Sequence, residues 1–292
     1  MEYLSVAEIA KKWGISDRMV RHYCAMGRVD GAFLTGKTWN IPEDACKPEN
    51  ERQAGENLLS ILKTQKHMGL TGGIYHKVQI ELAYNSNHIE GSTLTHDQTR
   101  YIYETHTIEA VGAVNVDDVV ETSNHFRCLD YVIDNATKPL TETMIKKLHF
   151  MLKTGTGDSR LARFNVGEYK LLPNEVGGKE TCKPENVRTE IAKLLTEYNA
   201  KGHKSIEDII EFHKRFESIH PFQDGNGRVG RLIMFKECIA NDVVPFIIDE
   251  KHKMFYYRGL SEWDNEKGYL IDTCLSCQDK FKAWLDYFKI RY

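Results

Sequence analysis

The sequence predicts a mainly α-helical protein with a small separate unit at its N-terminus. Apolar residues recur at helical spacing through most of the chain, and only two short stretches carry the turn residues of a β-hairpin. The 292 residues, of which 41% are hydrophobic and 28% charged, suffice for about two domains with a sizeable core. A disordered or low-complexity chain is therefore excluded.

Charge and cysteine content limit the class of partner. The 39 Lys+Arg and 42 Asp+Glu residues give a formal net charge of −3, so no global field draws the chain onto nucleic acid or an anionic membrane. The seven cysteines are odd in number and scattered, which favours reduced thiols over a secreted disulfide framework. Neither a signal-peptide pattern nor an apolar stretch of about 18 residues is present. We therefore expect a cytoplasmic protein with no membrane partner.

Residues 1–47 form the predicted N-terminal unit. The Ser-x-x-Glu spacing at residues 5–8 is a capping box, which predicts a helix over 6–13 that stops at a glycine. A second short helix over 17–27 and a small hairpin over 32–41 follow. Two short helices joined by a tight turn and followed by a hairpin resemble the winged helix-turn-helix modules of the excisionase/MerR type.

DNA is one expected partner of this unit. Arg18, Arg21 and His22 lie on the second helix, where a helix-turn-helix reads the major groove. However, residues 1–50 carry seven basic and seven acidic residues, so the basic surplus typical of DNA-binding domains is missing. A protein-interaction or structural role stays open. Residues 48–56 are polar without periodicity and are interpreted as a linker.

Residues 57–292 are interpreted as one helical domain. A short hairpin is expected at about 163–180, where Pro173-Asn174 and Gly177-Gly178 supply turn residues. Helical apolar spacing covers about 57–68, 74–89, 96–105, 116–134, 142–153, 187–199, 206–219, 228–241 and 269–288.

The segment after the helix at 206–219 carries the chemistry. His220 precedes a proline, which ends that helix. Gly225 and Gly227 allow consecutive amides to turn inward as an anion nest, at the point where the next helix, opening near Arg228, directs its positive end. A phosphate group fits such a site.

Three charged side chains complete this pattern. Arg228 and Arg231 are three residues apart, so they share a helix face and can both bind phosphate oxygens. Asp224 supplies a hard oxygen, and a lone carboxylate beside phosphates is a common way to hold Mg²⁺. The simpler interpretations are a turn-capping aspartate and a solvated arginine face.

Two other nucleotide motifs are excluded. Gly225, Gly227 and Gly230 match the spacing of the dinucleotide fingerprint, but an amphipathic helix precedes them where that motif needs a buried strand in a βαβ unit. No Gly-x-x-x-x-Gly-Lys-Ser/Thr motif occurs, which removes the P-loop.

The twelve residues 220–231 (HPFQDGNGRVGR) resemble the signature of the Fic (filamentation induced by cAMP) family at all nine specified positions. The resemblance extends over roughly 60–290. It implies a Fic-type helical bundle whose hairpin serves as a target-docking flap, and a protein adenylyltransferase that moves AMP from Mg-ATP to a Ser, Thr or Tyr hydroxyl. Family members often form dimers, so a homodimer is also expected.

The resemblance assigns roles to single residues. His220 would be the general base, and Asp224 would bind Mg²⁺. The Tyr257 and Asn265 assignments rest on a weaker match, which contains an apparent one-residue shift. The implied nucleotide-binding set is Gly225, Asn226, Gly227, Arg228, Arg231, Tyr257 and Asn265.

An inhibitory motif is also implied upstream. Ser86 and Glu90 match the family pattern Ser/Thr-x-x-x-Glu-Gly/Asn on a helix over 74–90, and the expected partner of Glu90 is Arg231. This pair would switch the transferase off. An ordinary surface glutamate and a helix back-bonding serine stay open as alternatives, as do AMP removal and a DNA-binding regulator with a nucleotide-sensing core.

Overall fold

The computed structural model divides the chain into two compact units, Met1–Glu56 and Asn57–Tyr292, which are described separately. The described residues are 3–15, 17–25, 27, 29–36, 38–47, 57–109 and 112–292, without the side chains at 18, 19 and 22. Ser16, which the sequence offers as the N-cap of the second helix, lies outside this part of the chain, as do the linker over 48–56 and the side chains of Arg18 and His22.

The N-terminal unit combines two helices with a small antiparallel sheet. Ser5 and Glu8 form the predicted capping box, and Gly14 ends the first helix in a left-handed conformation with φ 66°. The strand order is β1-β3-β2, and the sequence did not indicate β1. The elements are β1 (Tyr3–Leu4), α1 (Val6–Trp13), α2 (Asp17–Ala25), β2 (Phe33–Thr35) and β3 (Thr38–Pro42).

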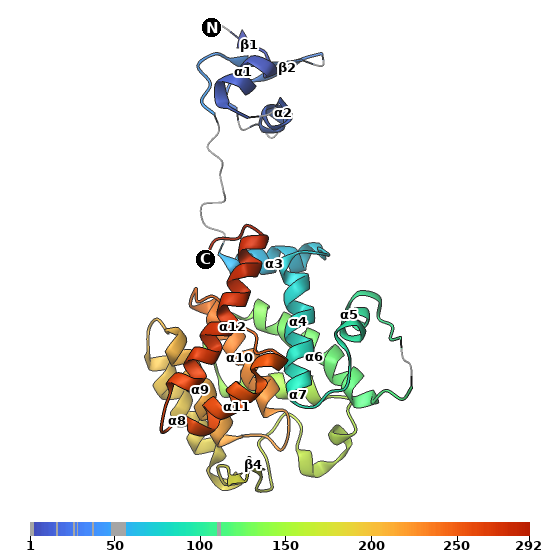
Figure 1. Cartoon of the computed structure of the whole chain (residues 1–292), viewed down its shortest axis with the longest axis vertical. Coiled ribbons are helices and arrows are strands. Elements are labelled where there is room, and N and C mark those ends of the chain that lie inside the picture. The colour runs from blue at the N-terminus through green and yellow to red at the C-terminus, as the bar shows by residue number, and fades with distance from the viewer. Residues whose placement is uncertain are drawn as a thin grey trace. The chain divides into compact units, whose positions relative to one another are not determined.

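The larger unit is built from helices, as predicted (Figure 1). All strand pairs among the described residues are antiparallel, which agrees with the exclusion of a βαβ dinucleotide fold. Its helices are α3 (Leu58–Met68), α4 (Ile74–Ile89), α5 (His96–Thr105), α6 (Val116–Asp134), α7 (Glu142–Lys153), α8 (Pro184–Ala200), α9 (Ile206–Ile219), α10 (Asn226–Ala240), α11 (Lys253–Glu262) and α12 (Gly268–Tyr287). Three 3₁₀ turns, η1 (Asp158–Arg160), η2 (Ala162–Phe164) and η3 (Glu250–His252), and the strands β4 (Glu175–Val176) and β5 (Lys179–Glu180) complete it.

Short-range capping explains where many of these helices begin. In each case the side chain before the first helical residue accepts a hydrogen bond from a backbone amide of the first turn. Thr95 and Ser205 form complete capping boxes with Gln98 and Asp208. The remaining capping residues are Asn57, Asn115 and Thr141.

Helix α10 is the centre of the larger unit. Every residue from Asn226 to Ile239 is buried, and α10 packs against α4, α6, α7 and α9. The helix therefore carries its charged residues into a region of low polarity. Since a buried charge must be paired, the positions of its partners are strongly constrained.

Two sequence predictions need correction, and one helix was not predicted. Helix α10 begins at Asn226 because Gly225 is its N-cap, two residues before the predicted start at Arg228. The hairpin predicted at 163–180 is confined to β4 and β5, since the preceding Tyr169 and Lys170 are buried and fastened to other elements. The sequence did not indicate α11. Within the described residues, no helix has both the length and the apolar character needed to cross a membrane.

Candidate active site

The loop between α9 and α10 is held in an unusual backbone conformation. His220 ends α9 with φ 51° and ψ 63°, in the left-handed region that a residue with a Cβ rarely adopts. The side chain of Phe222 is fully buried, as expected from the sequence. The anchored ring beyond Pro221 helps to hold His220 in this strained position.

The side chain of Asn226 shapes this loop. Its Oδ1 accepts a hydrogen bond from the Phe222 amide at 2.8 Å, and its Nδ2 donates to the Phe222 carbonyl at 2.8 Å. Asn226 is 1% exposed. The sequence placed this side chain on the phosphates, whereas in the structure it links the two ends of the loop and leaves only backbone amides for an anion.

His149 on α7 also supports this loop. Its ring stacks on that of Phe222 with centroids 3.9 Å apart. Its Nδ1 accepts a hydrogen bond from the Gly167 amide at 3.0 Å, so its Nε2 donates to the Asp224 carbonyl at 3.1 Å. Burial lowers the pKa of His149 to about 4, which keeps this neutral tautomer at pH 7.

The two glycines predicted to form a nest have separate physical reasons. Gly225 has φ 80°, which favours glycine. At Gly227, a Cβ would collide with the carboxylate of Glu90 and would lie 2.8 Å from the Arg231 guanidinium. A carboxylate therefore already lies at the first turn of α10, where the sequence predicts an anion.

Glu90 and Ser86 both contact Arg231. The Arg231 guanidinium donates to the Glu90 carboxylate at 2.7 Å, to the Ser86 hydroxyl at 3.0 Å and to the Ser86 carbonyl at 2.9 Å. Arg231 is 4% exposed. Although burial alone would lower its pKa, the charge of Glu90 outweighs burial and raises it. Glu90 is the C-cap of α4, one residue beyond the helix.

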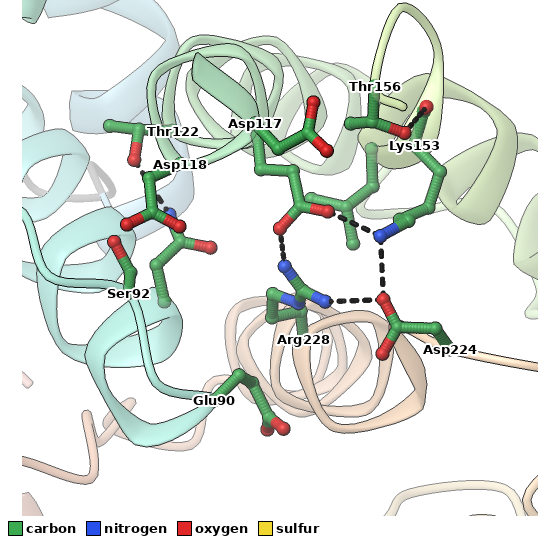
Figure 2. Close-up of polar contacts among 12 residues, drawn as sticks. Glu90, Ser92, Asp117, Asp118, Thr122, Lys153, Thr156, Asp224 and Arg228 are labelled. Carbon is green, nitrogen blue, oxygen red and sulfur yellow. Dashed lines mark hydrogen bonds and ion pairs between the residues drawn. The ribbon is translucent and has the colours of Figure 1, made fainter. Parts of the chain in front are cut away.

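Arg228 is neutralised by a different set of groups, which we call the Asp224 network (Figure 2). Arg228 donates to the Asp224 carboxylate at 3.0 Å and forms an ion pair with Glu121 on α6. Lys153, at the end of α7, pairs with Glu121 as well, with Asp224 at 2.6 Å and with Asp158 at 3.0 Å. The network thus joins α6, α7 and α10.

Asp224 keeps the features that a magnesium ligand needs. Its Oδ2 accepts from Lys153 and Arg228, while the side chain as a whole is 41% exposed. Burial would raise its pKa, but the Lys153 ammonium outweighs burial, so the pKa lies below the ordinary 3.8 and the group is ionised at pH 7. Among the described residues no group of three His, Cys, Asp or Glu could form a complete metal cage. A Mg²⁺ ion held by one carboxylate, waters and substrate phosphates fits this donor set.

His220 is a neutral imidazole in this structure. Burial is the main cause that lowers its pKa to about 4, and the nearby Lys170 ammonium adds to the effect. Its Nδ1 lies 3.3 Å from the Glu217 carbonyl oxygen, which can only accept, so Nδ1 carries the proton. The unprotonated Nε2 can therefore accept a proton.

Lys170 ties the hairpin segment to the loop. This lysine is 2% exposed, and its ammonium donates to the Asn174 side chain at 2.7 Å and the Thr181 hydroxyl at 2.6 Å. Its backbone amide donates to the Pro221 carbonyl at 2.9 Å, and Asn174 donates to the Phe222 carbonyl at 3.1 Å. The hairpin is thus fixed beside His220.

Tyr257 and Asn265 are placed differently from the rest of the predicted set. The hydroxyl of Tyr257 donates to the Ile89 carbonyl at 3.1 Å, next to Glu90. Asn265 lies on the turn after α11, and its amide donates to Glu262 at 3.0 Å. In this structure it is engaged on its own turn and not with the loop at 220–231.

Sequence reasoning missed Glu121, Lys153 and His149. Their partners lie far away in the sequence, and they belong to no local motif. The sequence feature that could have identified them is a polar side chain on the inward face of an otherwise apolar helix.

We expect the imidazole of His220 to titrate with a midpoint near pH 4 in the nucleotide-free protein, well below the ordinary value of 6.5. The physical cause is burial, which disfavours the charged form. The measurement is an NMR titration of the histidine Cε1–H signals, with the His220 signal assigned by its loss in His220→Ala. A midpoint near 6.5 would show that the ring is solvated.

Replacing Lys153 by methionine should lower the free energy of unfolding by about 3–5 kcal/mol at pH 7, because buried carboxylates lose their cation. The depressed pKa of Asp224 stabilises the fold above its ordinary 3.8, and this contribution is lost as pH falls through the folded pKa. The deficit of Lys153→Met should therefore shrink towards pH 3. Urea unfolding at several pH values measures it.

The exposed Lys147 on the same helix provides the matched control. Lys147→Met should change the unfolding free energy by less than about 0.5 kcal/mol at either pH. Equal losses in the two variants would contradict the role given to the Asp224 network.

The sequence of this chain is similar to the sequences of known proteins. The family model described as Fic/DOC family matches residues 139–238. Protein adenylyltransferase Fic of Drosophila grimshawi is 29% identical over 185 residues, which are 61% of this chain and 36% of the relative. The relative of the same name from Drosophila willistoni is 30% identical over 186 residues, 61% of this chain and 35% of the relative. The match thus spans about a third of the length of these relatives.

Solved structures agree at the level of the fold. The crystal structure of a Fic domain containing signaling protein from Bacteroides thetaiotaomicron has a TM-score of 0.59 and 27% identity, and the match covers 78% of this chain and 90% of that one. A Fic family protein from Desulfovibrio desulfuricans has a TM-score of 0.60 at 20% identity and matches 80% of this chain and 74% of that one. The family match shows that residues 139–238 form a Fic/DOC family domain, and the structure from Bacteroides thetaiotaomicron agrees with it.

Proposed function

We propose that this protein is a protein adenylyltransferase that transfers AMP from ATP to a Ser, Thr or Tyr hydroxyl of a target protein. The observation that carries the proposal is the α9–α10 loop, which places a proton acceptor, His220, beside an anion site at the N-terminus of α10. The name of the Drosophila relatives and the Fic/DOC match support the same activity.

The reaction places a simple demand on His220. The target hydroxyl oxygen attacks the α-phosphorus of ATP, the bond from that phosphorus to the bridging oxygen of the β-phosphate breaks, and pyrophosphate leaves. The hydroxyl proton goes to Nε2 of His220, whose Nδ1 already donates to the Glu217 carbonyl. A positioned general base of this kind contributes about 10²–10⁴-fold to the rate.

The other groups bind the triphosphate. The amides of residues 225–227 and the positive end of α10 would hold phosphate oxygens, and Arg228 and Arg231 would neutralise their charge. Asp224 would hold Mg²⁺, which when bound would offset negative charge on the phosphates. Because the loop is already locked by Asn226 and His149, little reorganisation is needed when substrate binds.

We also propose that the resting protein is autoinhibited by Glu90. Its carboxylate lies on Gly227 and pairs with Arg231 at 2.7 Å, at the position that a terminal phosphate would take. Two anions compete for one guanidinium and one helix terminus, so a bound triphosphate meets repulsion in this region. Glu90 is an exposed residue at the C-cap of α4, so its side chain can leave Arg231 with little loss of core packing.

Replacing Glu90 by glycine should raise AMP incorporation into the protein itself by at least about tenfold, because Arg231 becomes free for the phosphates. The measurement compares transfer of label from α-labelled and γ-labelled ATP, with intact mass to identify one added AMP. Glu90→Gly/His220→Ala should abolish incorporation. Glu109→Gly, at an exposed glutamate outside the site, should match the wild type.

Each other outcome has a definite meaning. Label retained from the γ-phosphate would make the protein a kinase and overturn the proposal. Equal incorporation by Glu90→Gly and the wild type would leave the transferase but remove the autoinhibition. Loss of a pre-attached AMP from modified protein would identify removal as the dominant reaction.

We propose a second role for the N-terminal unit, which is binding to DNA as a winged helix-turn-helix. The observation that favours it is the tight connection between α1 and α2 at Gly14, followed by the β2–β3 hairpin. Arg21 on α2 is exposed, and within the described part of this unit its ion pair with Asp17 is weak, at 3.8 Å, so that the guanidinium can turn to a phosphate.

A gel-shift assay with the whole protein and duplex DNA tests this role. Binding should weaken by at least about tenfold between 50 and 200 mM salt, because phosphate contacts release counterions. Arg21→Ala should weaken binding further. No shift at low salt would leave the unit with a protein-interaction or structural role.

A further inference from the structure

We propose that Glu217, one turn before His220 on α9, controls the basicity of that histidine. The carboxyl group is neutral while Glu90 is paired with Arg231, and it ionises when Glu90 is withdrawn. This inference rests on the proposed transferase function, and it makes Glu217 a positioning residue that acts through His220.

The first observation is the distance between the two side chains. The Glu217 carboxyl oxygen Oε2 lies 4.0 Å from Nδ1 of His220, the nitrogen that donates to the Glu217 carbonyl. A charge on this carboxyl would therefore act directly on the imidazole. An ionised carboxylate would stabilise the imidazolium that forms when Nε2 takes a proton.

The second observation is that the side-chain hydrogen bonds of the structure do not account for a carboxyl group at this position. Its Oε1 is buried and has no hydrogen-bond partner among the described residues. It lies 4.0 Å from Nε2 of His213, and a Cβ on Gly230 would lie 2.8 Å from it. An unpaired buried carboxyl group lowers the stability of the fold. If this position served packing alone, an apolar residue would give a more stable protein.

The third observation concerns the charges around Glu217. Nε2 of His213 on α9 forms a hydrogen bond with the Tyr256 hydroxyl of α11 at 2.7 Å. Burial lowers the pKa of His213 to about 3, so its ring is neutral. Tyr256 and Tyr257 both have raised pKa values through burial and are neutral as well. The remaining neighbours are Arg231 of α10, Glu90 beyond α4 and, on the far side of His220, Lys170.

Arg231 thus acts on two carboxyl groups, on Glu90 through direct contact and on Glu217 through electrostatic attraction. While Glu90 neutralises Arg231, a second negative charge at Glu217 would be uncompensated in a region of low polarity. Burial, followed by the charge of Glu90, raises the pKa of Glu217 to about 8. Burial remains when Glu90 leaves, but the repulsion from the Glu90 carboxylate is lost while Arg231 still attracts a negative charge, so the pKa of Glu217 falls and its proton is released more readily.

The consequence is a link between the switch and the base. Withdrawal of Glu90 frees Arg231 and, through Glu217, makes His220 a stronger base in the nucleotide-free protein. A terminal phosphate bound to Arg231 takes the place of the Glu90 carboxylate, so the effect is largest before the triphosphate binds.

The test measures the titration of His220 by NMR in the nucleotide-free protein, so it needs no activity. The midpoint should rise by about one pH unit or more from the wild type to Glu90→Gly, because a carboxylate at 4 Å stabilises the imidazolium. In Glu90→Gly/Glu217→Gln it should fall to the wild-type value or below it, because the charge of Glu90 itself raises the pKa of His220. Glu90→Gly/Glu211→Gln, at a more exposed glutamate of the same helix, should titrate like Glu90→Gly.

The pH profile of self-modification gives a second reading. Activity is lost as pH falls through the pKa of the base. At ATP concentrations well below saturation, where the rate reports the free enzyme, the acid limb of Glu90→Gly should therefore lie at higher pH than that of Glu90→Gly/Glu217→Gln. If Glu217→Gln does not fold, Glu217→Asp serves instead, since the shorter side chain weakens the effect.

Equal His220 midpoints in Glu90→Gly with and without Glu217 would overturn the inference, even if AMP transfer is observed. Conversely, a shifted midpoint with no AMP transfer would uphold the link between Glu90, Glu217 and His220 and overturn the proposed function.

Discussion

The burial of two arginines one turn apart on α10 is the constraint on which the site depends. Arg228 and Arg231 are 6% and 4% exposed, and a charge at such depth must be compensated. Their surroundings separate them into two systems. Arg228 is tied to α6 and α7 through Glu121 and Asp224, whereas Arg231 is tied to α4 through Glu90 and Ser86.

These two systems differ in how readily they can change. Glu121 belongs to the body of a long helix, so its removal from Arg228 would require that α6 shift against the core. Glu90 lies beyond the last turn of α4 and is held by one carboxylate oxygen, so it can leave with little disruption. The geometry therefore provides one permanent anchor and one removable partner, which is what a switched phosphate site requires.

The sequence predicted the helices and the loop well because their causes are local. Capping boxes at Ser5, Thr95 and Ser205 act over three residues, and the positive φ of Gly225 is a requirement of its own position. The partners of the arginines could not be found in this way. Glu121 and Lys153 are 32 residues apart, and Lys153 and Asp224 are 71 apart, so only the packing of α6, α7 and α10 brings them together.

The role of Asn226 shows why a motif alone does not settle what each of its residues does. An amide side chain between two glycines suggests a phosphate contact, but this side chain closes the loop by pairing with both backbone groups of Phe222. The amides left open by that closure are the ones that α10 directs outward at its first turn. The side chain thus serves anion binding indirectly, by committing its own hydrogen bonds so that the backbone donors of the turn remain available.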